Sequence, residues 1–301
     1  MKRIELICVV GPTAAGKSEL AVTLAKKYDG EIISADSRQI YEGMNIGSGK
    51  VDGKWKKGIY VYKDIPHYLI DEASPRIQYS AARFQKKCKK IIAEISKRGK
   101  IPIICGGTGY WIDAVVNGQD LPEVKPNSTL RKKLSKFSPS QLYAKLLKLD
   151  PARAKLIDAK NPHRLIRALE IVLTTGKPVP KVRQTKHDNV LWLGIKPSMN
   201  VLEKNIQKRL HSRMRLGMLN EVKTLHKNGL SWKKLESFGL EYKYCALYLQ
   251  NKISKQEMEQ NILLASRQYA KRQLTWWKRN PEIIWSESPK KLLTLAKKQL
   301  S

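Results

Sequence analysis

The sequence predicts an α/β protein in which helices flank a parallel β-sheet and a mainly helical segment is inserted into the sheet-forming chain. Three features of the 301 residues support this class: short apolar runs that alternate with helical stretches, a glycine-rich turn directly after the first apolar run, and a proline-punctuated middle without clear strands. With 42% hydrophobic residues, the chain can bury a substantial core.

The apolar runs and helical patterns define three segments. Strands are expected at Ile4–Val10, Ile32–Ile33, Ile101–Cys105, Val190–Ile195 and Ile283–Trp285. Helices are expected at Glu19–Tyr28, Ala81–Arg98, Asn200–Asn228, Lys255–Arg279 and Pro289–Leu300. Between them, Lys-rich helical patterns are interrupted by prolines from Pro122 to Pro180. We therefore expect a first core segment at 1–116, a helical insertion at 117–188, and a second core segment with C-terminal helices at 189–301.

The first turn matches a phosphate-binding loop. Gly11–Ser18 has the pattern G-x-x-x-x-G-K-[ST] between an apolar strand and an amphipathic helix, as that pattern requires. Its backbone N–H groups can converge on phosphate oxygens, Lys17 supplies positive charge, and the Ser18 hydroxyl can ligate Mg²⁺. The core is therefore predicted to be P-loop NTPase-like and to hold a di- or triphosphate. The residues expected to bind it are Gly11, Thr13, Ala14, Ala15, Gly16, Lys17 and Ser18.

Two further loops follow predicted strands. Ser34–Tyr41 contains Asp36, which could bind Mg²⁺ or act as a general base, although a local side-chain cap is the better interpretation of such a segment in isolation. Its neighbours Ser37, Arg38 and Gln39 can hydrogen-bond a second substrate. Gly106–Tyr110 is rich in glycine, which permits close approach of a ligand. Because the carboxyl ends of parallel strands lie at one edge of a sheet, the three loops predict a shared crevice.

Two other segments are given structural interpretations. His67–Asp71 ends in a carboxylate, as the metal-binding strand of an NTPase would, but Pro66 precedes it and a loop follows. We interpret it as a short structural strand. Gly47–Lys50 echoes a phosphate-binding loop without a strand before it, so we expect a turn.

The composition limits the partners and the compartment. A formal net charge of +32 predicts a polyanionic partner, nucleic acid first, with a generally lysine-rich surface as the alternative. Four cysteines lie far apart, which indicates neither a disulfide framework nor a zinc site. No apolar run reaches the roughly 18 residues of a membrane span. We expect a cytoplasmic protein without a secretory segment or membrane contact.

Together these motifs resemble those of the tRNA dimethylallyltransferases, also called tRNA isopentenyltransferases or IPP transferases, over nearly the whole chain. The matching segments are Gly11–Ser18, Ser34–Tyr41, Gly43–Gly47, Gly106–Gly109, Arg164–Glu170, Thr175–Pro178 and Arg267–Trp276. The resemblance implies transfer of a dimethylallyl group from dimethylallyl diphosphate to N6 of the adenosine 3′-adjacent to a tRNA anticodon, with release of diphosphate and with Mg²⁺ as cofactor.

The resemblance also implies roles for residues. Asp36 would be the general base, Arg209 would stabilise the diphosphate together with Lys17, and Thr13 and Thr108 would line the pocket. The target nucleotide would meet Asp36, Ser37, Arg38 and Gln39. Further tRNA contacts would come from Arg131, His163, Arg164, Leu165, Ile166 and Arg167 in the insertion, and from Arg267, Lys271 and Arg272 on the late helix. A solvated basic face is the alternative for that helix. The expected partners are the anticodon stem-loop and dimethylallyl diphosphate, bound by a monomer.

One departure and three rival functions remain. Where the family often has G-Y-K-E, this chain has Phe238–Tyr244, so no contact is carried over to that segment. The rivals are an adenylate isopentenyltransferase that acts on free AMP, ADP or ATP, a P-loop small-molecule kinase or NTPase, and a non-catalytic RNA-binding protein. The basic insertion disfavours the first, the weak metal-binding strand disfavours the second, and the third leaves the phosphate loop without a role.

Overall fold

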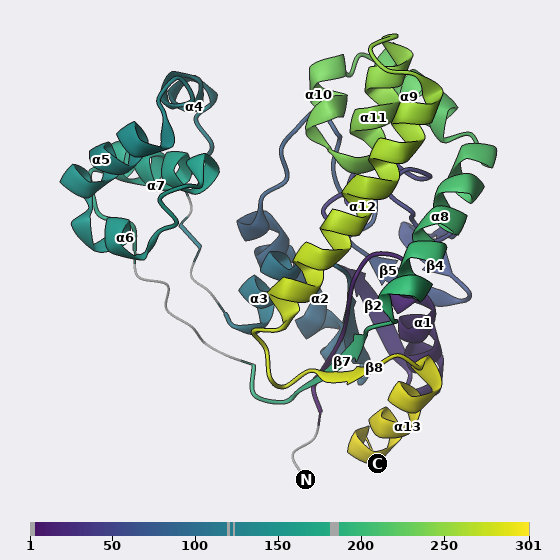
Figure 1. The fold of residues 1–301 in the computed structure, drawn as a ribbon. Helices are drawn as coiled ribbons and strands as arrows, with labels where there is room; N and C mark the ends of the chain where they lie inside the picture. The colour runs from purple at the N-terminus through teal and green to yellow at the C-terminus, as the bar shows by residue number, and fades with distance from the viewer. Residues whose placement is uncertain (1–3, 119–120, 123, 181–186, 301) are drawn as a thin grey trace. The chain divides into compact units, whose positions relative to one another are not determined.

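The computed structural model describes residues 4–118, 121–122, 124–180 and 187–300. The described chain forms two compact units, one within Met1–Val116 and Lys186–Ser301, the other within Asn117–Thr185. Figure 1 shows the larger unit as a sheet covered by helices and the smaller unit as helices without a described strand. None of the described helices combines the length and the apolar character needed to cross a membrane.

The larger unit is built on an eight-stranded sheet. Its strands lie in the order β3-β4-β5-β2-β6-β1-β7-β8. Their bounds are β1 (Leu6–Val10), β2 (Gly30–Ser34), β3 (Lys54–Lys56), β4 (Ile59–Tyr62), β5 (Ile65–Tyr68), β6 (Ile101–Cys105), β7 (Val190–Ile195) and β8 (Ile284–Ser286). In this order, the six strands β5, β2, β6, β1, β7 and β8 are parallel to their neighbours. β3 and β4 form a hairpin at one edge, and β4 pairs with β5 in antiparallel orientation. The predicted α/β class with a mainly parallel sheet is confirmed.

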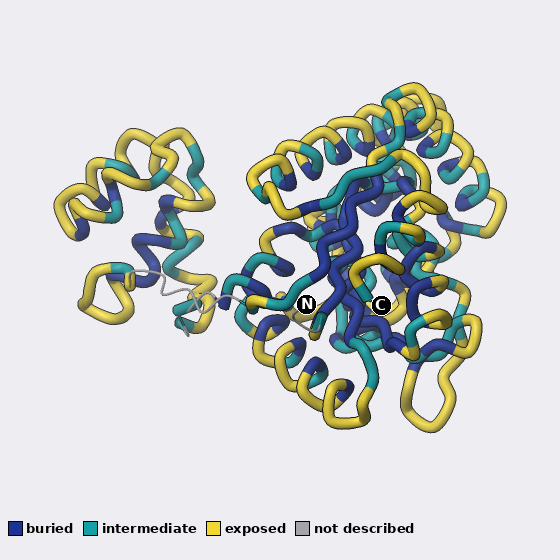
Figure 2. The backbone as a smooth tube through the Cα atoms, turned by 90° about the horizontal axis from the view of Figure 1, so that it is seen from below, coloured by how far each residue is buried: buried dark blue, intermediate teal, exposed yellow. Residues whose placement is uncertain are grey.

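Helices cover both faces of this sheet. They are α1 (Lys17–Lys27), α2 (Ala81–Lys97), α3 (Gly109–Val116), α8 (Met199–Arg215), α9 (Met218–Lys227), α10 (Trp232–Ser237), α11 (Leu240–Leu249), α12 (Lys255–Trp277) and α13 (Pro289–Leu300). The central strand β1 is buried on both sides, which explains its unbroken apolar run. Leu6, Cys8 and Val10 pack with residues of α2, α3 and α12, whereas Ile7 and Val9 pack with residues of α1 and α13. Figure 2 shows the strands as a buried layer between these helices.

The structure differs from the sequence expectations at four places. Two helices, α10 and α11, form where no helix was expected. The strand expected at His67–Asp71 is β5, which begins before Pro66 and ends at Tyr68, because an edge of the parallel sheet beside the hairpin tolerates a proline.

The helix expected over Asn200–Asn228 is two helices, because Gly217 has a φ of 94°, in the left-handed region that breaks a helix. The β3–β4 hairpin was not expected. Lys57 and Gly58 form its two-residue turn, with φ of 48° and 77°, and this turn lacks the Asn-Gly or Asp-Gly pair that usually marks one.

Prolines begin helices in the smaller unit. Its helices are α4 (Ser128–Leu134), α5 (Pro139–Leu149), α6 (Pro151–Leu156) and α7 (Pro162–Thr175). The last three each carry proline in the first turn, directly after a capping side chain from Ser138, Asp150 or Asn161. Their apolar faces meet in a core of leucines and alanines.

A buried carboxylate links α4 to α7. Glu170 is fully buried and accepts a hydrogen bond from Asn127 N–H and a bidentate pair from the Arg131 guanidinium, at 2.7–2.8 Å, together with one from Arg167. Burial by itself raises the pKa of Glu170, but the hydrogen bonds from Arg131, Asn127 and Arg167 outweigh it and lower the pKa to about 2. The charged form of Glu170 therefore stabilises the fold of this unit.

We expect Glu170→Gln to destabilise the smaller unit by about 3 kcal/mol at neutral pH, because two arginines lose their shared counter-ion. The folded pKa lies below the ordinary value of 4.5, so the contribution is present above about pH 4.5 and is lost as the pH falls towards 2. Hydrogen exchange of peptides from α4 and α7, compared at pH 7 and pH 3, measures both effects. Glu94→Gln, at an exposed pair with Lys90, is the control and should change exchange little. Equal effects of the two variants would contradict the interpretation.

Candidate active site

The phosphate-binding loop is shaped by its glycines. A side chain at Gly11, where φ is 143°, would overlap the Ile195 carbonyl oxygen at the end of β7. Gly16, with a φ of 91°, precedes α1, so that Lys17 is the first residue of the helix. Lys17 Nζ lies 2.7 Å from the Pro12 carbonyl oxygen, to which it donates. The loop therefore presents the N-terminus of α1 and a half-buried cation to the same space.

Within the described residues, Lys17 forms no ion pair with a carboxylate. Burial lowers its pKa to about 8, while Cys105 and Asp36 act to raise it and Arg209 acts to lower it. Arg209, on α8, donates to Thr13 Oγ1 at 2.7 Å, and burial lowers its pKa to about 10. Two half-buried cations at one loop, each with a lowered pKa, favour an anion between them.

Asp36 follows β2 and faces the same cavity. Its Oδ1 accepts hydrogen bonds from the N–H groups of Arg38, at 2.8 Å, and Gln39, at 3.4 Å. The local cap considered from sequence therefore exists, and the same side chain also lines the cavity. Within the described part of the chain, Oδ2 accepts no hydrogen bond. One oxygen is thus fixed by backbone and the other is available to a ligand.

The third loop completes the crevice. Gly106 has no room for a Cβ, which would overlap the Ala35 carbonyl, and Thr108 Oγ1 accepts from Ser37 N–H at 3.1 Å. Gln273 of α12 joins this loop to the first: its Oε1 accepts from Thr13 N–H at 2.7 Å and its Nε2 donates to the Gly107 carbonyl at 2.9 Å. Gln273 lies within the segment Arg267–Trp276, but no role for its side chain was predicted from the sequence.

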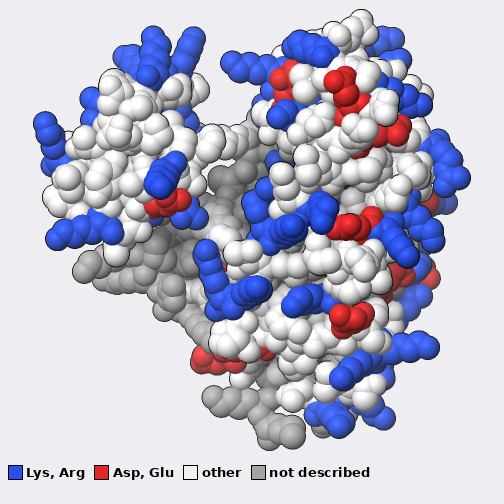
Figure 3. All heavy atoms as spheres, viewed as in Figure 1, with Lys and Arg blue, Asp and Glu red and all other residues white. Residues whose placement is uncertain are grey.

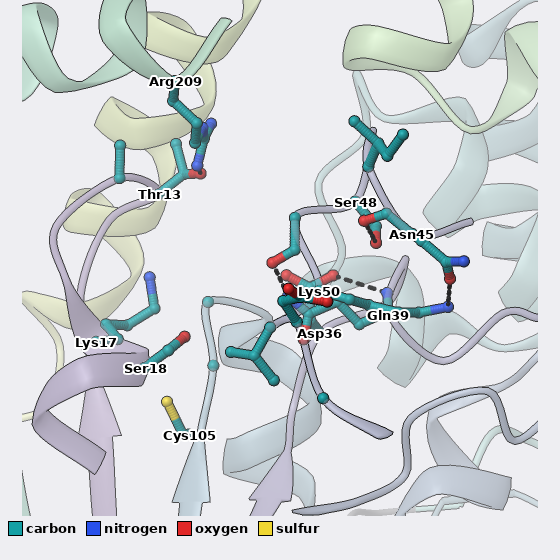
Figure 4. Close-up of a pocket in the computed structure, with 18 of the residues that line it drawn as sticks. Thr13, Lys17, Ser18, Asp36, Gln39, Asn45, Ser48, Lys50, Cys105 and Arg209 are labelled. Atoms are coloured by element: carbon teal, nitrogen blue, oxygen red, sulfur yellow. Dashed lines mark hydrogen bonds between the residues drawn. The ribbon is translucent and has the colours of Figure 1, made fainter. Parts of the chain in front are cut away.

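Two cavities meet around these residues. The first, of about 790 Å³, is lined by the phosphate-binding loop, Asp36, Gly106 and Arg209. Figure 4 shows Thr13, Lys17, Ser18 and Arg209 on one side of this cavity and Asp36 on the other. The second, of about 450 Å³, shares Thr13, Asp36 and Arg209 with the first and continues between α11 and α12. The predicted crevice residues of the larger unit therefore lie together.

The residues beside Asp36 have mixed environments. Arg38 Nε donates to the Phe238 carbonyl at 2.7 Å, and its guanidinium lies 5.7 Å from the Phe238 ring centroid. Gln39 is used within the protein, because its side chain bonds Ser34 Oγ and the Gly49 carbonyl. Ser37 and Arg38 line the second cavity. Of the two, Arg38 carries the charge that could meet a nucleotide.

The basic residues of α12 are exposed but not equivalent. Arg267 forms an ion pair with Glu203 at 2.8 Å, Lys271 faces solvent, and Arg272 lines the second cavity 5.8 Å from the Tyr269 ring centroid. Figure 3 shows Lys and Arg side chains spread over this face of α12, with fewer Asp and Glu. Trp277 is buried and Trp276 Nε1 donates to Asp113 at 2.7 Å, so the opposite face of the helix packs inward.

The expected tRNA contacts of the insertion lie in the smaller unit. His163 and Arg164 are exposed in the first turn of α7, and Ile166 is half-buried. Leu165 is fully buried in the core of this unit, so its side chain is not available to a ligand. Arg131 and Arg167 are paired with Glu170, so both also serve the fold of the unit.

Two segments interpreted as structural are fixed by polar contacts. Asp71 lies beyond the end of β5 and forms an ion pair with Lys50, which also donates to the Tyr41 carbonyl and Asn45 Oδ1. Gly47–Lys50 is a turn in the structure, and Glu221 accepts from the N–H groups of residues 45–47 at 2.6–3.0 Å. These contacts hold the turn against the cavity.

Comparison with known proteins places this site in a family. The family model described as IPP transferase matches residues 39–280, and that described as isopentenyl transferase matches residues 4–64. The tRNA dimethylallyltransferase 2 of Trichlorobacter lovleyi is 38% identical over 91% of this chain and 88% of its own length. The tRNA dimethylallyltransferase of Carboxydothermus hydrogenoformans is 39% identical over 96% of this chain and 94% of its own.

Solved structures agree with the sequence relatives. The full-length tRNA isopentenylpyrophosphate transferase of Bacillus halodurans matches with a TM-score of 0.70 and 32% identity, covering 98% of this chain and 96% of the other. A eukaryotic dimethylallyltransferase acting on tRNA matches with a TM-score of 0.79 and 26% identity, covering 98% and 77%. The resemblance inferred from the motifs is confirmed, and the chain belongs to the IPP transferase family.

Proposed function

We propose that this enzyme transfers a dimethylallyl group from dimethylallyl diphosphate to N6 of the adenosine 3′-adjacent to the anticodon in tRNA and releases diphosphate. The observation that carries the proposal is the shared cavity in which Asp36 faces the phosphate-binding loop and two half-buried cations, Lys17 and Arg209. This arrangement provides a base and a leaving-group site within one space. Both curated relatives described above carry the name of this activity.

The cations assist departure of diphosphate. When the allylic C–O bond breaks, negative charge grows on the bridging oxygen and spreads over the diphosphate. Lys17 and Arg209, with the backbone N–H groups before α1, are already oriented towards that charge, so little reorganisation is needed in the transition state. The phosphate-binding loop thus serves a leaving group here rather than a transferred phosphoryl group.

Asp36 assists the nucleophile. The lone pair of an exocyclic adenine amine is delocalised into the ring, so the amine reacts poorly unless its proton is removed during attack. The N–H groups of Arg38 and Gln39 hold Oδ1, which directs Oδ2 to accept that proton. The adenine would enter through the second cavity, past Arg38, Tyr269 and Arg272, after leaving the stack of the anticodon loop.

Mg²⁺ is proposed as the cofactor, held chiefly by diphosphate oxygens and water. Within the described residues no group of three or more His, Cys, Asp or Glu could hold a metal by itself. The Ser18 hydroxyl lines the cavity next to Lys17 and fits one ligand position of such an ion. The ion would neutralise charge on the leaving diphosphate.

The rival functions differ in substrate, so one experiment separates them. The purified protein is incubated with Mg²⁺ and radiolabelled dimethylallyl diphosphate. Parallel reactions contain, as the second substrate, unmodified tRNA, free AMP, or ATP alone. Label recovered as N6-prenyladenosine in tRNA is the expected result. Label on AMP would instead identify an adenylate isopentenyltransferase, and ATP turnover without a prenyl product would identify a kinase or NTPase.

Replacement of the base tests the assignment of Asp36. Asp36→Asn keeps the Oδ1 acceptor but removes the proton acceptor, so we expect kcat to fall by at least about 100-fold. The Kd for tRNA should stay within a few-fold of wild type. Asp29→Asn, before the opposite end of β2, is the control. Loss of tRNA binding in Asp36→Asn with normal turnover at saturating tRNA would refute the role.

The pKa of Lys17 gives a pH signature for the diphosphate site. In the protein without ligand, Lys17 loses its proton above about pH 8. A bound anion keeps Lys17 protonated, so the affinity for inorganic pyrophosphate should fall as the pH rises through 8. Lys17→Arg keeps its charge over this range and serves as the reference. Calorimetry should show the wild-type affinity falling relative to Lys17→Arg by roughly tenfold between pH 8.5 and 9.5. Parallel curves for the two proteins would exclude Lys17 as the titrating group.

A further inference from the structure

Two arginines one turn apart on α8 share a single carboxylate. Arg213 Nη1 donates directly to Glu241 Oε1, on the first turn of α11. Arg209 Nη2 lies 3.8 Å from the same oxygen, beyond hydrogen-bond distance, while Arg209 Nη1 donates to Thr13 Oγ1 at 2.7 Å. Glu241 therefore holds Arg213 closely and Arg209 only through charge, which leaves the Arg209 guanidinium directed at the phosphate-binding loop.

The cluster is enclosed, so its charges act strongly. The side chains of Arg213 and Glu241 are 8% and 7% exposed, and that of Arg209 is 26% exposed. Gly49 packs directly on Arg213, because a Cβ at Gly49 would overlap its Nη2. Arg213 is thus confined from the side of the Gly47–Lys50 turn, and it interacts with the charges of Glu241 and Arg209. At this burial, removal of one partner leaves the other as an uncompensated charge, which is unfavourable.

The segment that supplies Glu241 has an unusual backbone. Gly239 has φ and ψ of 72° and −172°, a region open essentially to glycine alone, and Leu240 follows with a φ of 44°. These two residues turn the chain so that α11 begins at Leu240 and Glu241, in its first turn, meets Arg213 of α8. Gly239 and Leu240 both lie in Phe238–Tyr244, the segment that departs from the family's usual G-Y-K-E.

We propose that Glu241 and Arg213 are positioning residues that act as a pair: Arg213 occupies Glu241, and this keeps Arg209 on Thr13 and on the diphosphate. The inference rests on the proposed function for the role of Arg209. Without Glu241, the two arginines would repel and Arg209 would leave Thr13. Without Arg213, Glu241 would take Arg209 as its hydrogen-bond partner and draw it away from the diphosphate.

The pair predicts an unusual mutational pattern. Glu241→Gln and Arg213→Met should each lower kcat/KM for dimethylallyl diphosphate by about 10- to 100-fold, with tRNA affinity little changed. The double variant removes both charges and should return to within about fivefold of wild type. Arg213→Lys retains a cation on Glu241 and should lose less than Arg213→Met. The affinity for inorganic pyrophosphate, measured by calorimetry, should follow the same order.

Controls separate positioning from folding and from the proposed function. Glu31→Gln removes a buried carboxylate, paired with Arg98, at the opposite end of β2, and should lower Tm without lowering kcat. If the losses in the double variant add instead of cancelling, the pairing inference is wrong, whether or not the singles remain folded. If wild type prenylates no tRNA, the proposed function fails, while recovery of pyrophosphate affinity in the double variant would still support the pair.

Discussion

The parallel register of β1, β2 and β6 is the constraint on which the site depends. Val9 and Ser34 both lie opposite Cys105, so the three strands end in one row. Three loops leave that row side by side and therefore border the same cavity. They are the phosphate-binding loop, the Asp36 loop and the Gly106 loop. Gln273 then fixes two of the loops to each other from α12, which makes the helical layer part of the site.

The electrostatics of the crevice are arranged for a ligand rather than for the empty protein. Lys17 and Arg209 are half-buried and line the same cavity, and each has a lowered pKa because desolvation disfavours its charge. Bound diphosphate and its metal would compensate the two cations. Folding brings the cations together at a cost in free energy, and binding of the ligand would recover part of that cost. Glu241 carries one charge and lies near two arginines, so the arginines keep a net positive charge that attracts the leaving group.

Much of this could be predicted from sequence, because the decisive signals are local. The phosphate-binding loop and the strand-end loops are contiguous, and glycine at positions 11 and 106 directly reflects the lack of space there. Arg209 could be identified only by resemblance, since nothing local distinguishes it among many basic residues. Gln273, Arg213 and Glu241 were missed because their partners are more than 25 residues away in sequence. The opposite case is Leu165, which the motif predicted to contact tRNA but whose side chain is buried in the core of the smaller unit.

The β3–β4 hairpin has a consequence for association. An outer strand exposes unpaired backbone groups that another chain could extend, and β3 forms one edge of this sheet. It is only three residues long, and Lys54 and Lys56 flank Trp55 along it. If β3 of a second molecule paired with this edge, its two lysines would lie close to Lys54 and Lys56 and repel them. The lysine content that suits a polyanionic partner therefore also discourages growth of the sheet from one molecule into the next.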